Sequence, residues 1–271
     1  MIRKPAVAGM FYPSDGKILQ ELVSSLLSGS GRESDESITG IVSPHAGYVY
    51  SGAVAGAAFA SAPDNVKNVI VIAPPHRYPV TDASVFDGEG YETPLGILPL
   101  QREITSRLLG AGLTFQPGAH RSEHSAEVQL PFIQVRWPDS SVAVILQGSV
   151  SADYSGQLAE IISEAVRGFN NTLVIASSDL SHYHSLAAAE KMDMKVIDAF
   201  VSGNPSNMEE ALAEGAEACG IGPILTLMNY AVINKQTRFG EIMWETSAAA
   251  SGDNSSVVGY FAGFCGGEAG K

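Results

Sequence analysis

Residues 66–73, with the sequence VKNVIVIA, decide the fold class of this chain. Their β-branched side chains run together, a pattern typical of a strand that is buried on both faces of a parallel sheet. Two similar apolar runs, residues 142–146 (VAVIL) and 172–176 (TLVIA), predict two more buried strands. Residues 38–42 predict another strand earlier in the chain.

Segments with helical spacing separate these strands. We expect helices at residues 16–27, from about 51, and at 101–109, 123–135, 154–166, 186–201, 207–214 and 222–232. Two final strands are expected at residues 242–246 and 256–264. Strands that alternate with helices predict an α/β fold, with a central, mostly parallel, mixed sheet and helices on both faces. We see no linker that divides the chain, so we expect a single domain over residues 1–271.

The charge balance excludes some classes of partner. The chain has 16 basic and 29 acidic residues, which gives a net charge of −13 at neutral pH. Such an excess repels phosphate backbones and anionic membranes. We therefore expect neither nucleic acid nor membrane as a partner.

The cysteine count and the N-terminus bear on location. Two cysteines, Cys219 and Cys265, are too few for a disulfide framework. Residues 1–13 fail as a signal peptide because prolines and a glycine interrupt their short apolar stretch. No apolar run reaches the roughly 18 residues of a membrane span. These features predict a cytoplasmic protein.

Histidines follow three of the predicted strands. His45 lies just beyond the strand at residues 38–42, and His76 just beyond the one at 66–73. His182 and His184 lie just beyond the strand at 172–176. Sites in open parallel sheets form outside the carboxyl ends of the strands. Taken together, the three junctions predict a functional site at one edge of the sheet. The alternative for any one histidine alone is a turn or capping residue.

Cys219 and Asp179 each have two interpretations. Cys219 directly precedes an apolar helix, whose positive end would lower the pKa of the thiol and favour the thiolate. The alternative is a small buried apolar residue, as most free cysteines are. Asp179, three residues before His182, is either an acid–base partner or a cap.

Residues 122–127 (SEHSAE) are expected to open a helix. Because His124 and Glu127 are three residues apart, they would share a helix face and could point together into a cleft. The alternative is a polar first turn, with Ser122 as the cap and acidic residues facing the helix dipole. His120, just before this segment, is expected to be exposed in a polar loop.

A series of motifs resembles the MEMO family, whose prokaryotic members are called AmmeMemoRadiSam system protein B. The motifs cover nearly the whole chain, and their order and number make the resemblance specific. They are residues 3–9 (RKPAVAG), 11–13 (FYP), 44–52 (PHAGYVYSG), 75–76 (PH), 91–95 (YETPL), 123–127 (EHSAE), 177–182 (SSDLSH), 219–220 (CG) and 255–260 (SSVVGY).

The resemblance implies a fold related to the class III (LigB-type) extradiol dioxygenases, which are non-haem iron enzymes. It implies that His45, His76 and Cys219 are metal ligands and that His182 is an acid–base residue with Asp179 near it. Dioxygenases use two histidines and a carboxylate. A thiolate in place of the carboxylate suits one divalent transition metal, with iron or copper expected and zinc also compatible.

The sequence is compatible with three functions. The first is a metal-dependent redox enzyme whose substrate pocket is lined by Tyr48, His124, Glu127 and Ser178. The second is a non-enzymatic module that binds a small molecule, a peptide or a partner protein in the same cleft; the resemblance implies AMMECR-type and radical-SAM system partners. The third is zinc-dependent hydrolysis, or its metal-free variant with Cys219 as the nucleophile.

Overall fold

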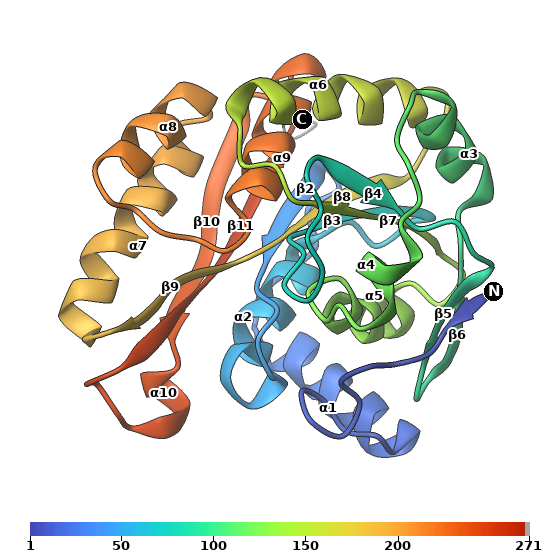
Figure 1. Cartoon of the computed structure of the whole chain (residues 1–271). Helices are drawn as coiled ribbons and strands as arrows, with labels where there is room; N and C mark the ends of the chain where they lie inside the picture. The colour runs from blue at the N-terminus through green and yellow to red at the C-terminus, as the bar shows by residue number, and fades with distance from the viewer. Residues whose placement is uncertain (269–271) are drawn as a thin grey trace.

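A computed structural model describes residues 1–268 of the chain, and its main sheet confirms the predicted α/β class (Figure 1). Four parallel strands form the centre, in the order β2 (Ile38–Ser43), β8 (Thr172–Ser177), β3 (Asn68–Ala73) and β7 (Ser141–Gln147). Antiparallel strands complete it: β4 (Ala83–Val85) beside β7, and β11 (Val257–Gly266) and β10 (Arg238–Thr246) beyond β2. The sheet is therefore mixed, as predicted.

Helices cover both faces of this sheet (Figure 1). Strand β3 shows why: its residues Val69 and Val71 pack into one hydrophobic core, while Ile70 and Ile72 pack into the other. The first core includes α1 (Gly16–Gly29), α2 (Tyr48–Ser61) and α5 (Leu130–Arg136). The second includes α3 (Arg102–Gly110), α6 (Ala152–Ala165), α7 (Leu186–Val201), α8 (Pro205–Ala213) and α9 (Ile221–Ile233). None of the helices within residues 1–268 is both long and apolar enough to cross a membrane.

The predicted helix over residues 123–135 is wrong in its first part. The chain forms the short helix α4 (Pro117–Arg121), leaves helical conformation over residues 122–126, and continues through a 3₁₀ turn, η1 (Glu127–Gln129), into α5. The cause is Glu123. Its carboxylate accepts the backbone N–H groups of His124 and Ser125, and these bonds hold residues 123–125 in a turn instead of a helix. Consequently, His124 and Glu127 do not share a helix face.

Several short elements were not predicted. Strand β9 (Asp179–His184) continues directly after β8 and pairs with β11, so His182 and His184 lie on a strand rather than in a loop. A second sheet contains β1 (Ile2–Arg3), β5 (Gly90–Thr93) and β6 (Gly96–Pro99), and a last short helix is α10 (Ala248–Ser251). These segments are too short for a periodic pattern to identify.

His120 is buried, and the expectation of an exposed loop residue is wrong. It belongs to α4, and its Nε2 lies 3.0 Å from Ser84 Oγ. Burial and the nearby Arg3 charge lower the pKa of His120 from 6.5 to about 3. The folded protein therefore holds a neutral imidazole there at every pH above about 4.

This burial predicts a pH-dependent loss of stability. As the pH falls below about 6.5, the unfolded chain takes up a proton at His120 while the folded chain does not, so the free energy of unfolding falls by up to about 1.4 kcal/mol per pH unit. Above pH 7 the effect is absent. Urea unfolding at several pH values between 7 and 4.5 should give a shallower dependence for His120→Gln than for the unchanged chain. Identical slopes would contradict this.

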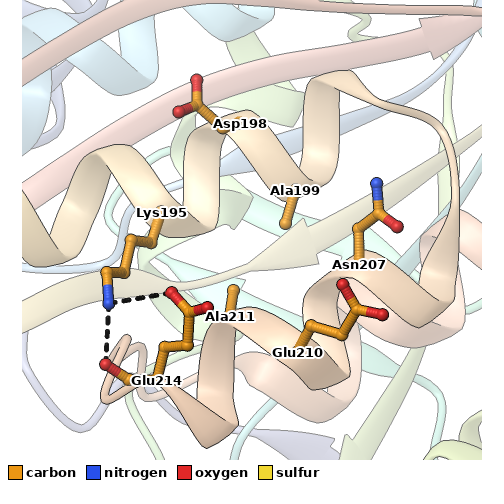
Figure 2. Close-up of a pocket in the computed structure, with 7 residues that line it drawn as sticks. All are labelled: Lys195, Asp198, Ala199, Asn207, Glu210, Ala211 and Glu214. Atoms are coloured by element: carbon orange, nitrogen blue, oxygen red, sulfur yellow. Dashed lines mark hydrogen bonds and ion pairs between the residues drawn. The ribbon is translucent and has the colours of Figure 1, made fainter.

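A pocket of about 270 Å³ lies between α7 and α8 on the outside of the second core (Figure 2). Its lining includes Asp198, Glu210 and Glu214, and Lys195 neutralises one of these acids with a 3.2 Å ion pair to Glu214. None of the residues predicted for the functional site lines it. The pocket is a surface groove between two helices, and we assign it no role in the predicted site.

Candidate metal centre

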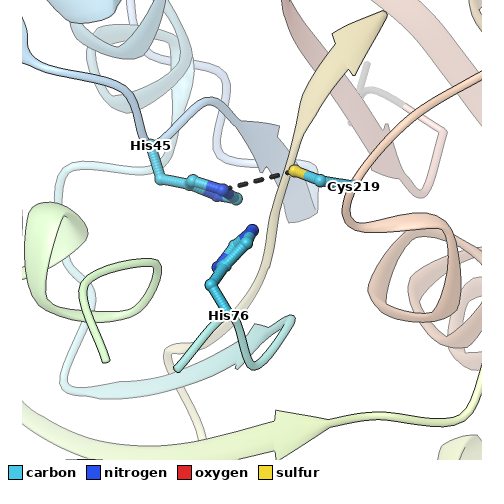
Figure 3. Close-up of side chains that lie close together, drawn as sticks. All are labelled: His45, His76 and Cys219. Carbon is cyan, nitrogen blue, oxygen red and sulfur yellow. Dashed lines mark hydrogen bonds between the residues drawn. The ribbon is translucent and has the colours of Figure 1, made fainter. Parts of the chain in front are cut away.

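Three segments that are distant in sequence bring His45, His76 and Cys219 together (Figure 3). His45 follows β2, His76 follows β3, and Cys219 precedes α9. One ligand atom from each residue lies within 4.8 Å of the others. The parallel strands β2, β8 and β3 end at the same edge, which is why the two imidazoles meet there.

Hydrogen bonds fix the tautomer of His45. Its Nδ1 lies 2.9 Å from Ser177 Oγ. Because the Ser177 hydroxyl donates its only proton to the carbonyl of Ser125, at 2.8 Å, its oxygen must accept from Nδ1–H of His45. The Nε2 atom of His45 therefore carries a lone pair, and it faces Cys219 Sγ at 3.3 Å. Burial and the neighbouring histidines hold the pKa of His45 well below its usual value, which keeps the ring neutral.

The loop that carries Cys219 packs directly against the end of β8. The backbone N–H of Cys219 donates to the Asp179 carbonyl at 3.2 Å, and the Asp179 N–H donates to Cys219 Sγ at 3.2 Å. Gly220 permits this approach, since a Cβ there would lie 2.4 Å from the Ser177 carbonyl oxygen. Ser178 is fully buried in the same contact, where it accepts the Gly220 N–H.

The expectation of an acidic thiol is wrong for the protein without a metal. Burial, together with the negative charge of Asp179, raises the pKa of the Cys219 thiol well above its usual value. The position of Cys219 before the N-terminus of α9 does not offset this rise in the pKa. The raised pKa favours the thiol form, whose proton can go to His45 Nε2 at 3.3 Å or to the Asp179 carbonyl oxygen at 3.5 Å. A cation between these atoms would replace that proton and stabilise the thiolate.

Asp179 supports the backbone of the site. Its carboxylate accepts the backbone N–H of His45 at 2.7 Å, and burial raises the pKa of the carboxyl group. His182 lies on β9 opposite Val258 and is partly buried. It is not a member of the cluster of possible metal ligands, but it is near enough to influence the pKa values of both His45 and Asp179. Its role in proton transfer stays a prediction.

Two residues predicted to line the substrate pocket have their polar atoms engaged elsewhere. Tyr48 is buried, and its hydroxyl donates to the carbonyl of Val128 at 2.7 Å. Glu127 is also buried; its carboxylate pairs with Arg3 and accepts two backbone N–H groups and the hydroxyl of Tyr12. Glu127 therefore anchors the N-terminal segment and is not free to bind a ligand.

His124 and Glu123 lie next to His76. The His124 ring centroid is 4.8 Å from that of His76 and 5.6 Å from that of His45. The sequence did not identify Glu123 as a residue of the site, because its position suggested only an acidic side chain that faces a helix dipole. Burial alone would raise the pKa of Glu123, but hydrogen bonds from His124, His76 and backbone N–H groups hold it well below the usual range.

A pocket of about 210 Å³ opens beside Cys219. Four prolines border it, and so does Gln147. The amide of Gln147 is already bonded to Ser155 and Thr226. The rest of the lining is Pro74, Pro75, Tyr78, Pro79, Val80, Gly148, Val150, Gly222 and Pro223. Cys219 is the one proposed metal ligand among these lining residues.

Comparison with known proteins gives consistent matches along the chain. A family model described as Memo-like protein matches residues 3–264. A MEMO1 family protein of Methanosarcina mazei is 33% identical over 96% of this chain and 98% of its own. MEMO1 family proteins of Methanobrevibacter smithii and Thermotoga neapolitana are both 34% identical, over 97% and 96% of this chain and 99% and 98% of theirs.

One solved structure is similar in fold. The crystal structure of an uncharacterized protein from Escherichia coli K12 gives a TM-score of 0.53 at 11% identity, covering 96% of this chain and 98% of that one. At that identity the likeness concerns the fold alone, and it agrees with the α/β class. The relation to extradiol dioxygenases stays a prediction.

Proposed function

The chain belongs to the Memo-like family, as its motifs predicted, and from this premise we propose that it is a metal-dependent redox protein. In this proposal one transition-metal ion is bound by His45 Nε2, His76 and Cys219 Sγ. The single observation that carries the proposal is the convergence of these ligand atoms within 4.8 Å.

The chemistry of the three residues fits a metal. His45 is neutral and has its Nε2 lone pair directed at the sulfur, which is the form that binds metal. Two imidazoles and a thiolate suit copper, iron or zinc better than magnesium or calcium. Three protein ligands also leave a coordination position for a small molecule. Iron or copper is proposed because the family resemblance implies a relation to non-haem iron dioxygenases; the donor set alone is equally compatible with zinc.

A bound iron or copper ion would supply electron transfer and activation of a ligand oxygen. The chain's own residues would do the rest. The pocket beside Cys219, bordered by four prolines and Tyr78, would admit and orient a small substrate. His182, with Asp179 near it, would hold and move a proton at its imidazole. His124, whose ring lies against those of His45 and His76, would border the substrate.

Metal analysis tests the proposal directly. Protein purified from iron- or copper-supplemented medium is expected to contain about one equivalent of the metal, and His45→Ala and His76→Ala are expected to lose it. His184→Ala is a matched control, because His184 lies on β9 and pairs with Glu217 outside the cluster. Elemental analysis provides the measurement. Substoichiometric metal in the unchanged chain, with no difference between the variants, would refute the metal centre.

A second candidate function is a binding module, favoured by an exposed apolar patch beside the site. Met10, Val49 and Tyr50 are exposed, and the Phe11 carbonyl accepts the Tyr48 N–H, which brings their two segments together. A peptide or a partner protein, such as the AMMECR-type and radical-SAM proteins that the family resemblance implies, would contact this patch. Oxygen consumption by the metal-loaded protein with catechols and thiols separates the two functions. No consumption would favour the binding module.

A further inference from the structure

We propose that Glu123 is a positioning residue that sets the tautomer and orientation of His76 for metal binding. The inference rests on the proposed function only in assuming that His76 is a ligand. Glu123 was not among the residues that the sequence identified, and it lies outside the set of three proposed ligands.

Glu123 bonds to both the backbone and the imidazole ring of His76. Its Oε1 atom lies 3.0 Å from His76 Nδ1, and its other carboxylate oxygen accepts the backbone N–H of His76. The carboxylate is almost fully buried, with 2% of the side chain exposed, so water does not compete for these bonds. Two bonds to one residue fix the position of the backbone and the rotation of the ring together.

The same geometry has a rival interpretation. His76, Glu123 and His124 lie close enough to form a second group that could hold a metal ion, with Glu123 as a ligand. The hydrogen bonds of Glu123 argue against this. Besides the two from His76, its carboxylate accepts the backbone N–H groups of Arg77 at 3.1 Å, His124 at 2.9 Å and Ser125 at 3.1 Å.

Five N–H groups thus point at a carboxylate that offers about four lone-pair sites. A metal ion at Glu123 would have to displace several of these bonds and leave buried backbone N–H groups without partners, which is costly. The carboxylate is therefore committed to the loops that carry His76 and His124. It orients a ligand and is not one itself.

The consequence concerns the two nitrogens of His76. An ionised carboxylate can only accept, so Nδ1 of His76 carries the proton and Nε2 keeps its lone pair. In Figure 3 the ring of His76 points its far edge toward His45 and Cys219. Ser177 fixes His45 in the same tautomer, so both imidazoles present Nε2 before any metal arrives. A carboxylate behind a ligating histidine also makes the ring a stronger donor.

Glu123→Gln tests the inference, because the amide keeps the size of the side chain and removes its charge. Two-dimensional ¹H–¹⁵N spectra of the histidine rings, recorded on metal-free protein, report the tautomer. We expect His76 to be the Nδ1–H form in the unchanged chain and a mixture in the variant, while His45 stays the same. Metal affinity, measured by competition with a chelator, is expected to fall about 10- to 100-fold.

Asp193→Asn is the matched control. Asp193 is another buried carboxylate, which accepts the backbone N–H of Ser181 and the indole N–H of Trp244 instead of a ligand histidine. Its replacement should alter stability without changing the tautomer of His76 or the metal affinity. A general loss of packing would affect both variants alike, whereas the proposed role affects only Glu123→Gln.

Three results would overturn the inference. One is an Nε2–H form of His76 in the unchanged, metal-free chain, which needs no variant and so remains decisive if Glu123→Gln fails to fold. Another is an unchanged tautomer and unchanged affinity in Glu123→Gln. The third is X-ray absorption showing a Glu123 oxygen bound to the metal. Because the spectra are recorded without metal, they test Glu123 even if the proposed metal centre fails.

Discussion

Replacing Cys219 by serine is expected to weaken metal binding by about 10²- to 10³-fold. Structural zinc sites with four ligands gain roughly 10–16 kcal/mol in total, so one ligand contributes on average about 2.5–4 kcal/mol. A serine hydroxyl is a poor substitute for a thiolate, because it does not ionise near neutral pH and is a harder donor. Chelator competition measures the affinity, and the sulfur-to-metal absorption of a copper- or iron-loaded sample should disappear.

Cys265→Ala is the control for this change. Cys265 is fully buried in the second core, opposite Gly40 on β2, and belongs to neither group of possible metal ligands within residues 1–268. Its replacement should leave metal affinity unchanged and lower the free energy of unfolding modestly. If Cys219→Ser binds metal as tightly as the unchanged chain, the thiol is not a ligand and the redox proposal loses its main support.

Glu127→Gln is expected to destabilise the fold by about 3–5 kcal/mol. Glu127 and Arg3 form an ion pair in which the side chains are 1% and 4% exposed. Removing one partner of such a pair leaves the other charge buried and uncompensated. The free energy of unfolding in urea, measured by circular dichroism, should show the loss. Glu127 also accepts the Ala6 and Val7 N–H groups, so proteolysis near the N-terminus should become faster.

Glu92→Gln is the matched control for the buried pair. Glu92 pairs with Lys4, whose side chain is 72% exposed, and a surface pair of this kind contributes at most about 1 kcal/mol. The double variant Arg3→Met with Glu127→Gln should be more stable than the sum of the two single changes predicts, because no lone charge remains. A loss below about 1 kcal/mol in Glu127→Gln would contradict a structural role for this pair.

The sequence predicted those parts of the structure that depend on local patterns. Runs of β-branched residues identified the central strands, and their parallel arrangement placed His45 and His76 at one edge of the sheet. Cys219 could be assigned to the same place only through the family resemblance. Nothing in the residues around it indicates that the start of α9 lies against β8.

The errors arose where a side chain bonds to distant backbone. Glu123 and Glu127 looked like the acidic first turn of a helix, since three-residue spacing is typical of one helix face. In the structure Glu123 gathers N–H groups from two loops, and Glu127 holds a segment about 120 residues earlier in the chain. Such partners are set by tertiary packing, which no local pattern reports.

The strand order has a consequence for how the centre forms during synthesis. Strands β2 and β3 are made early but do not pair with each other, because β8, made about 100 residues later, lies between them. Cys219 is 174 residues beyond His45. When only the first half of the chain has been made, His45 and His76 are therefore present without a fixed distance between them, and Cys219 is not yet present. Pairing over such distances makes folding slow, and a site with all three ligands can form only after Cys219 has been made.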